Sequence, residues 1–123
     1  MANHNVRGWG RLLYAFGYSM KGLKACFAAE EAFRQELLLF LFLAPLALWL
    51  GETPVERVLL LGCLLFVLIV ELLNSAIEAN VDRVGMERHE LAGRAKDIAS
   101  AAVFLSIVLV ATVWALVLVP KWL

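Results

Sequence analysis

Charged residues are scarce in this sequence, and those present cancel. They make up 18% of the 123 residues, with eleven Lys or Arg against eleven Asp or Glu, so the formal net charge is zero. Soluble domains average about 25% charged residues. Because the chain as a whole carries no excess of positive charge, no nucleic-acid partner is expected.

Cysteine and the motifs of common soluble enzymes are also nearly absent. Cys26 and Cys63 stand 37 residues apart without metal-ligand spacing, and are expected to be small apolar side chains, buried or facing lipid. No GxxxxGK[ST] motif occurs, so a kinase activity would need a site other than a P-loop. His89-Glu90 begins like HExxH, but position 93 is glycine, which argues against a zinc-protease helix. Basic residues interrupt the first 30 positions, so no cleavable signal peptide is expected.

Hydrophobic residues, in contrast, make up 63% of the chain, against about 45–50% in soluble domains. A water-soluble domain of this size has too much surface to bury that much apolar area. We therefore expect a single all-α membrane domain over residues 1–123, with spans at about 32–50, 57–81 and 97–119. Residues 7–29 combine apolar side chains at helical spacing with basic ones, which predicts an amphipathic helix on the membrane surface. The alternative for this segment is a cytoplasmic helix packed on the others.

The basic residues predict the orientation of these spans. Nine of the eleven lie within residues 1–36 or 82–97, whereas the turn at 51–57 and the C-terminus carry one each. By the positive-inside rule, the N-terminus and a loop at 82–97 face the cytoplasm. Three spans then place the C-terminus on the periplasmic side.

The second span carries the most informative polar residues, which we call the polar ladder: Glu71, Asn74, Glu78 and Asp82. Their spacing of i, i+3, i+7 and i+11 places them on one helix face, within less than a quarter-turn. Ionisable groups at membrane depth are costly and usually face a protein interior or a wet cavity. Three carboxylates in one line repel unless a cation lies among them, and oxygen ligands favour magnesium. The structural alternative is hydrogen bonding between helices.

Further charged residues lie at the cytoplasmic level of the spans. Glu30 and Glu31 could complete a metal site with the ladder. The basic residues there are of the types that bind phosphate oxygens: Arg11, Lys21, Lys24, Arg34, Arg88, Arg94 and Lys96. Carboxylates, metal and cations together favour phosphoryl transfer from a nucleotide at the membrane surface. A transporter is the alternative that this pattern alone leaves open.

Several motifs resemble those of the prokaryotic diacylglycerol kinases, which are small integral-membrane lipid kinases. The motifs are GYSMKGLKA at 17–25, AFRQE at 32–36, ELLNSAIEANVDRVG at 71–85 and HELAGRAKD at 89–97. The resemblance runs in register from about residue 7 to the end of the chain. It implies transfer of the γ-phosphate of MgATP to the primary hydroxyl of diacylglycerol, giving phosphatidic acid. It also implies a homotrimer in the bacterial inner membrane, with active sites shared between subunits.

The resemblance further implies roles for individual residues. Glu71 would be the general base for the lipid hydroxyl, and Asn74 would orient that hydroxyl or Glu71 itself. Glu30 and Glu78 would hold the divalent metal ions. The nucleotide would contact Arg11, Tyr18, Ser19, Glu30, Glu78, Glu87, Arg88, His89, Lys96 and Asp97. The lipid substrate would contact Ser19, Arg34, Gln35, Glu36, Glu71 and Ser100.

One departure and three alternatives remain at this point. Tyr14 stands where the family pattern has a lysine, so a phosphate contact at that position is unsupported. An undecaprenol kinase of the same family would need the same base, metals and nucleotide site, and no residue separates the two acceptors. A small proton-coupled exporter and a structural helper subunit belong to other classes. The polar ladder and the charged segment 82–97 favour the kinase over both.

Overall fold

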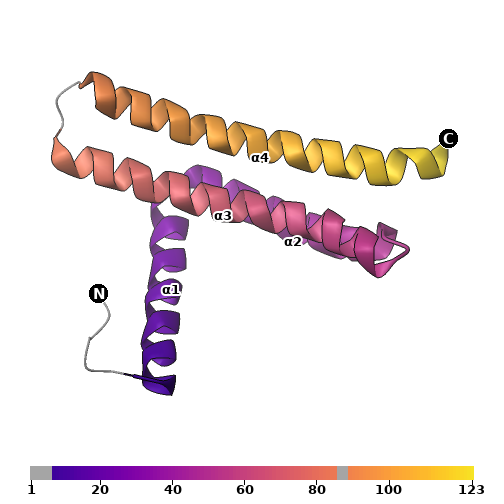
Figure 1. The fold of residues 1–123 in the computed structure, drawn as a ribbon, viewed down its shortest axis with the longest axis horizontal. Coiled ribbons are helices and arrows are strands. Elements are labelled where there is room, and N and C mark those ends of the chain that lie inside the picture. The colour runs from indigo at the N-terminus through magenta and orange to yellow at the C-terminus, as the bar shows by residue number, and fades with distance from the viewer. Residues whose placement is uncertain (1–6, 86–88) are drawn as a thin grey trace.

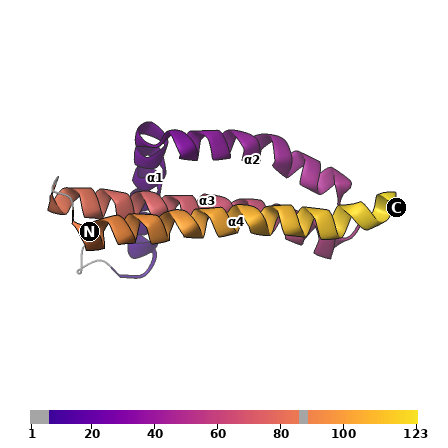
Figure 2. The same ribbon diagram turned by 90° about the horizontal axis from the view of Figure 1, so that it is seen from above.

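The computed structural model describes residues 7–85 and 89–123, and its regular structure over these residues is all helical. The helices are α1 (Trp9–Ala29), α2 (Glu31–Leu50), α3 (Pro54–Val84) and α4 (Glu90–Trp122). Figures 1 and 2 show α2, α3 and α4 lying lengthwise beside one another, while α1 runs crosswise to them. The fold is therefore a group of three lengthwise helices, in which α2 and α4 both pack on α3, with α1 running across them.

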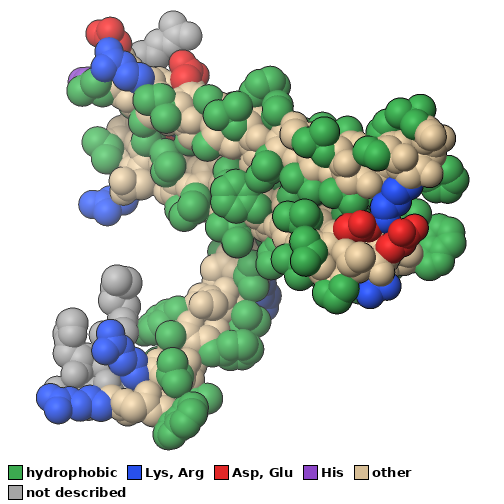
Figure 3. All heavy atoms as spheres, turned by 45° about the vertical axis from the view of Figure 1, so that its right-hand side comes forward, with side chains coloured by type: hydrophobic (Ala, Val, Ile, Leu, Met, Phe, Trp, Pro, Cys, Tyr) green, Lys and Arg blue, Asp and Glu red, His purple; other side chains and the backbone are tan. Residues whose placement is uncertain are grey.

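Three of these helices, α2, α3 and α4, are long and apolar enough to cross a membrane. Apolar side chains cover most of the face seen in Figure 3. So much exposed apolar surface is stable in lipid but not in water, and each helix satisfies its own backbone groups, as lipid requires. The predicted all-α class, with three apolar helices after an N-terminal helix, is confirmed.

The turn between α2 and α3 is defined by local chemistry. Thr53 Oγ1 accepts the backbone N–H of Glu56 at 3.2 Å, and Pro54 occupies the first helical position, where no N–H is needed. A Cβ on Gly51 would lie 2.6 Å from the Cγ atom of Arg57, so the close approach of the chain there requires glycine. These residues let α2 reverse directly into α3.

The prediction of a loop at 82–97 is wrong for most of this segment. α3 continues to Val84 and α4 begins at Glu90, so the residues on either side of the short connection are helical. His89 caps α4, because its Nδ1 atom accepts the backbone N–H of Leu91 at 3.0 Å. The sequence pattern marks where apolar residues stop, whereas a helix ends where its backbone hydrogen bonds stop. The helices therefore extend beyond the apolar segments.

Two buried clusters join the helices. The cluster nearer α1 contains Cys26, Phe33 and Leu68. The cluster nearer the α2–α3 turn contains Ala47, Leu60 and Leu64, with partly buried residues of α4 packed against it. Trp114 of α4 donates its indole N–H to the carbonyl oxygen of Leu60 at 3.2 Å, which links α4 to α3. The buried apolar side chains of α3 form a stripe along one face of the helix, and Glu71 follows the last of them, Leu68.

Candidate active site

Glu71 is the only charged side chain that is buried among the described residues, with 3% of its surface exposed. It continues the stripe formed by Leu60, Leu64 and Val67, which are themselves buried at helical spacing. The face that packs α3 into the bundle therefore delivers a carboxyl group into the same interior. An ionisable group in such a place is a candidate for function.

Three polar oxygen atoms in this region are buried and have no hydrogen-bond partner: Glu36 Oε2, Glu71 Oε2 and Asn74 Oδ1. Glu36 comes from α2, three residues after the buried Phe33, so it points at α3. The Glu71 carboxyl on α3 acts electrostatically on the Glu36 carboxyl. Buried polar atoms without partners are rare, and they mark places where a substrate, ion or proton is accommodated.

The outer part of the polar ladder is arranged differently. Lys96 of α4 reaches α3, and its Nζ atom lies 2.6 Å from Asp82 Oδ1. Glu78 also acts electrostatically on Lys96. A lysine thus supplies part of the positive charge that the sequence pattern assigned to a metal ion. Lys96, predicted to contact nucleotide, is paired with Asp82 in this structure.

No group of three or more His, Cys, Asp or Glu side chains able to hold a metal is found among residues 7–85 and 89–123. Magnesium in nucleotide sites is usually held by one or two carboxylates, with phosphate oxygens and water completing its shell. Glu30 and Glu78 are of the right chemistry for such a shell. They fit a magnesium ion that arrives with a triphosphate, rather than one held by the protein alone.

A groove of about 600 Å³ lies between α1 and α3. Its polar lining includes Ser19, Glu30 and Ser75, among small residues that let the two helices approach. Cys26 donates its thiol to Ser75 Oγ at 3.3 Å, which ties α1 to the face of α3 beside the ladder. The structure therefore brings two residues of the predicted site, Ser19 and Glu30, to α3.

Other predicted contacts on α1 and α2 have local roles in one chain. Arg34 donates through Nη1 to the carbonyl oxygens of Phe27 at 2.8 Å and Ala28 at 3.1 Å, so it satisfies the end of α1. Gln35 donates to Glu31 at 3.5 Å. Arg11, on the first turns of α1, is exposed, and this part of α1 lies far from α3 in Figure 1.

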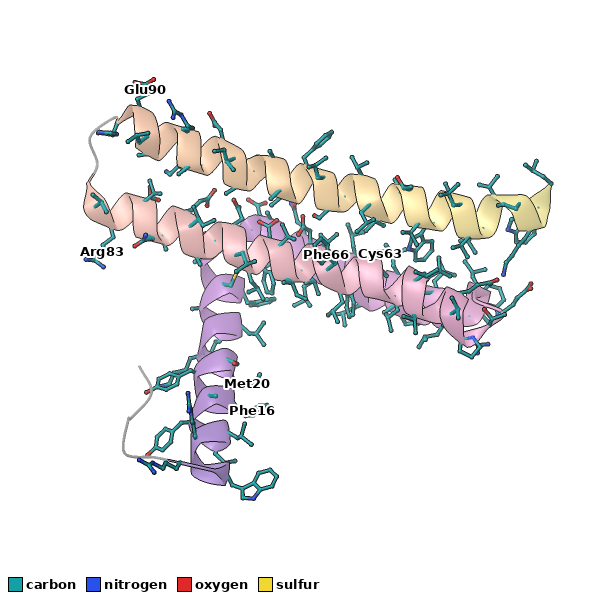
Figure 4. The ribbon with its side chains drawn as sticks, viewed as in Figure 1. Phe16, Met20, Cys63, Phe66, Arg83 and Glu90 are labelled. Atoms are coloured by element: carbon teal, nitrogen blue, oxygen red, sulfur yellow. The ribbon has the colours of Figure 1, made fainter. Side chains whose placement is uncertain are left out.

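The remaining predicted contacts lie on or near α4, apart from Tyr18. Asp97 and Ser100 are exposed on α4, and His89 is the helix cap described above. Tyr18 is exposed on α1, with the Lys21 ammonium 5.7 Å from its ring centre. In Figure 4, Arg83 and Glu90 mark the end where α3 is joined to α4, and Phe16 and Met20 project from α1. Two further predicted contacts, Glu87 and Arg88, lie outside the described residues.

Sequence reasoning missed the electrostatic influence of Glu71 on Glu36, which lies on another helix. Glu36 was assigned to the lipid, although its place one turn after Phe33 signals that it faces the same neighbour as that buried side chain. It also missed the pairing of Lys96 with Asp82. Both require knowledge of which helices pack together.

The sequence is similar to those of known proteins. A family model described as prokaryotic diacylglycerol kinase matches residues 17–118. A diacylglycerol kinase of Escherichia coli (strain K12) is 50% identical over 118 residues, which is 96% of each chain. A diacylglycerol kinase of Haemophilus influenzae is 48% identical over 111 residues, covering 90% of this chain and 94% of the relative. One of Pseudomonas aeruginosa is 50% identical over 111 residues, or 90% of each chain.

Proposed function

The chain belongs to the prokaryotic diacylglycerol kinase family, and from this premise we propose that it transfers the γ-phosphate of ATP to the primary hydroxyl of diacylglycerol, giving phosphatidic acid and ADP. It is a multi-pass membrane protein of that family. The observation that carries the proposal is Glu71, a buried carboxyl with an unpartnered oxygen at the end of an apolar stripe. A lipid hydroxyl needs a proton acceptor of this kind, held away from bulk water.

The chemistry assigned to the chain begins with proton transfer. Glu71 accepts the proton of the lipid hydroxyl while the lipid hydroxyl oxygen attacks the γ-phosphorus. The bond from that phosphorus to ADP then breaks. Asn74, one turn further along the same face, orients the hydroxyl. Its Oδ1 atom is buried and without a partner, which suits it to a substrate contact.

Glu30 and Glu78 are the proposed carboxylate ligands of Mg²⁺. The ion, when bound with ATP, supplies positive charge to the triphosphate oxygens. Glu30 lines the groove beside α3, and Glu78 is half-buried on the polar ladder. These positions support a site at the junction of α1 and α3.

The substrate contacts are proposed for the remaining site residues. ATP would be bound by Arg11, Tyr18, Ser19, Glu87, Arg88, His89, Lys96 and Asp97, together with the metal ligands. Diacylglycerol would be bound by Ser19, Arg34, Gln35, Glu36 and Ser100, together with Glu71. Arg11 belongs to the first turns of α1, and this part of α1 lies far from α3 in Figure 1. We therefore propose a homotrimer with shared active sites.

The proposed orientation follows from the same chemistry. ATP is cytoplasmic, so the N-terminus and the connection between α3 and α4 face the cytoplasm of the bacterial inner membrane, with the C-terminus in the periplasm. The whole chain, 1–123, then forms one kinase domain. Its surface helix is 7–29, and its spans are about 32–50, 57–81 and 97–119. The nine basic residues on one side support this placement.

Purified protein in lipid micelles, given radiolabelled ATP and diacylglycerol, should produce phosphatidic acid only when magnesium is present. If phosphorylated product formed from undecaprenol but not from diacylglycerol, the acceptor would be the polyprenol alcohol. Product from neither would contradict the kinase and return the exporter to consideration.

Sharing of active sites is tested by combining two inactive variants. Arg11→Ala and Glu71→Gln subunits, co-expressed and purified together, should recover part of the activity, since some sites would take both intact residues from different chains. Mixed trimers without recovered activity would contradict shared sites.

A further inference from the structure

Lys96 of α4 is held by a carboxylate of another helix, α3. Its Nζ atom lies 2.6 Å from Asp82 Oδ1, whereas Arg94 pairs with Glu90 on its own helix at 3.7 Å. A partner for Lys96 within α4 would stand three or four residues away. Those positions carry no carboxylate, being Ala92, Gly93, Ala99 and Ser100. The place of the Lys96 ammonium therefore depends on Asp82.

This pairing brings the Lys96 ammonium to the outer part of the polar ladder. Asp82 lies one turn beyond Glu78 on the same face of α3. Glu78 also acts electrostatically on Lys96. Because Glu78 is a proposed carboxylate ligand of Mg²⁺, a lysine held beside it is close to the place proposed for the triphosphate of ATP.

The Lys96 ammonium keeps the capacity to bind a ligand while Asp82 holds it. An ammonium has three N–H donors, and the contact with Asp82 Oδ1 uses one of them. The Lys96 side chain is 42% exposed. Val81 and Ala95, the chain neighbours of the pair, line a groove of about 690 Å³ between α3 and α4. The pair therefore borders open space from which a phosphate oxygen can reach the same ammonium.

The exposure of this pair argues against a role in stability alone. Ion pairs in contact with water contribute little to stability, because solvent screens their attraction and two side chains lose freedom. A lysine without a partner, however, samples many rotamers along its four-carbon stem, and this freedom is lost when it binds phosphate. Holding the lysine in place before ATP binds reduces that cost.

We propose that Asp82 is a positioning residue for ATP, which holds the Lys96 ammonium beside Glu78 in the place where Lys96 binds a phosphate oxygen of the nucleotide. Asp82 makes no contact with ATP and acts through Lys96. This inference rests on the proposed function and gives a role to the outermost residue of the polar ladder.

The sign of the effect on ATP binding distinguishes positioning from two other roles of Asp82. Asp82 and ATP are both anions, so an Asp82 that acted through its charge alone would repel ATP. An Asp82 that withheld Lys96 from the nucleotide would also weaken binding. In both cases Asp82→Asn would bind ATP more tightly than the wild type. Positioning predicts weaker binding, because the released lysine must be ordered again when ATP binds.

Isothermal titration calorimetry of the full chain in micelles without diacylglycerol, with MgATP as the titrant, measures this sign. Asp82→Asn should raise the Kd for ATP by about tenfold, as expected for one lost hydrogen bond to a charged group. Asp82→Glu keeps the carboxylate and should recover most of the affinity. Glu90→Gln, the control, removes the partner of Arg94 and should leave the Kd unchanged. An unchanged or lower Kd in Asp82→Asn would overturn the proposal.

A double-mutant cycle with Lys96→Met tests whether Asp82 acts through Lys96. Lys96→Met should itself raise the Kd, and adding Asp82→Asn should raise it no further, because no ammonium remains to be positioned. Additive increases would mean that Asp82 acts by another route, and would refute the assignment. The Tm of Asp82→Asn should stay close to that of the wild type, whereas a Tm that fell together with the affinity would assign the pair to the fold instead.

Turnover separates failure of this inference from failure of the proposed function. At saturating ATP, Asp82→Asn should keep its kcat within about twofold of the wild type, while its KM for ATP rises. A lower kcat with an unchanged KM would place Asp82 in the chemical step and contradict positioning. A wild type that phosphorylates lipid, with an unchanged Kd in Asp82→Asn, would refute this inference alone. A wild type that neither binds ATP nor phosphorylates either lipid would refute the proposed function and the inference with it.

Discussion

The two ends of α3 differ in how their charged side chains are partnered. At the end next to Gly51, which we call the paired end, every described charged side chain has a partner. Lys121 of α4 pairs with Glu56 and lies 3.6 Å from Glu52, and Arg57 donates to the carbonyl oxygen of Leu48 at 3.1 Å. Figure 3 shows these acidic and basic side chains side by side. The paired end closes α2, α3 and α4 against one another.

At the other end, the polar ladder begins with groups that have no such partners. Glu71 is more deeply buried than any charged side chain of the paired end, yet its Oε2 atom has no hydrogen-bond partner. The same is true of Asn74 Oδ1 and Glu36 Oε2. Charges that serve the fold are expected to be paired, whereas a site must leave groups available to its ligands. The difference separates the part that holds the helices together from the part that we propose performs the reaction.

Glu71→Gln should give the largest effect. Loss of the general base should lower kcat by about 10²- to 10⁴-fold, whereas Tm should stay the same or rise because an unpaired buried carboxylate destabilises a fold. Both are measured on the purified protein, by phosphatidic acid formation and by thermal unfolding. Glu90→Gln, at an exposed carboxylate at the start of α4, serves as the control and should behave as the wild type. An active Glu71→Gln variant would show that Glu71 is not the general base.

Glu78→Gln should raise the magnesium concentration that gives half-maximal activity, by about tenfold or more, since even outer ligands of a metal contribute that much to its affinity. The measurement is a magnesium titration of the kinase assay at fixed ATP. Glu90→Gln changes an exposed carboxylate at the start of α4, 3.7 Å from Arg94, and is the control. The same magnesium dependence in Glu78→Gln and wild type would exclude Glu78 as a ligand.

Gly51→Ala tests the paired end through its tightest contact. The new Cβ would lie 2.6 Å from the Arg57 Cγ atom and 3.1 Å from the Ala47 carbonyl oxygen. Such crowding should lower the free energy of unfolding by about 1–3 kcal/mol without changing kcat of the folded enzyme.

The matched control is Gly62→Ala, because a Cβ on this helical glycine meets no atom within 4 Å. Its stability should equal or slightly exceed that of the wild type, since alanine favours helix. Equal stability of the two alanine variants would contradict the close approach at Gly51.

Trp114→Phe should have the smallest effect. The change removes the indole N–H donated to the Leu60 carbonyl, and hydrogen bonds between membrane helices average about 0.6 kcal/mol. The Leu60 carbonyl still accepts from the Cys63 thiol at 3.3 Å. Denaturant unfolding in micelles measures the change, with Trp122→Phe, at an exposed tryptophan, as control. A large drop in kcat for Trp114→Phe would contradict the view that this end of the bundle serves stability rather than turnover.

Helical periodicity was sufficient to predict the features that belong to one helix at a time. The apolar lengths predicted three helices able to span a membrane, and the structure confirms three helices of that length and composition. The spacing of Glu71 from Asn74 placed both on one face of α3, and each has a buried side-chain oxygen there. These properties depend on local geometry that a single sequence encodes.

Features that involve two helices could not be derived in the same way. The electrostatic influence of Glu71 on Glu36 depends on how α2 packs against α3. The pairing of Lys96 with Asp82 depends on both helices continuing through the segment that was expected to be a loop. Arg34 donates to a backbone carbonyl oxygen at the end of α1. Its positive charge alone does not tell whether it binds this carbonyl or a lipid headgroup. Such choices are made by tertiary packing.

The most direct test of this division compares two variants for two properties in the same preparations. Glu71→Gln should lose nearly all turnover and keep or increase its Tm, whereas Lys121→Met should keep its turnover and show a lower Tm, because it deprives Glu52 and Glu56 of their partner. Turnover and thermal stability that fall together in either variant would contradict the account.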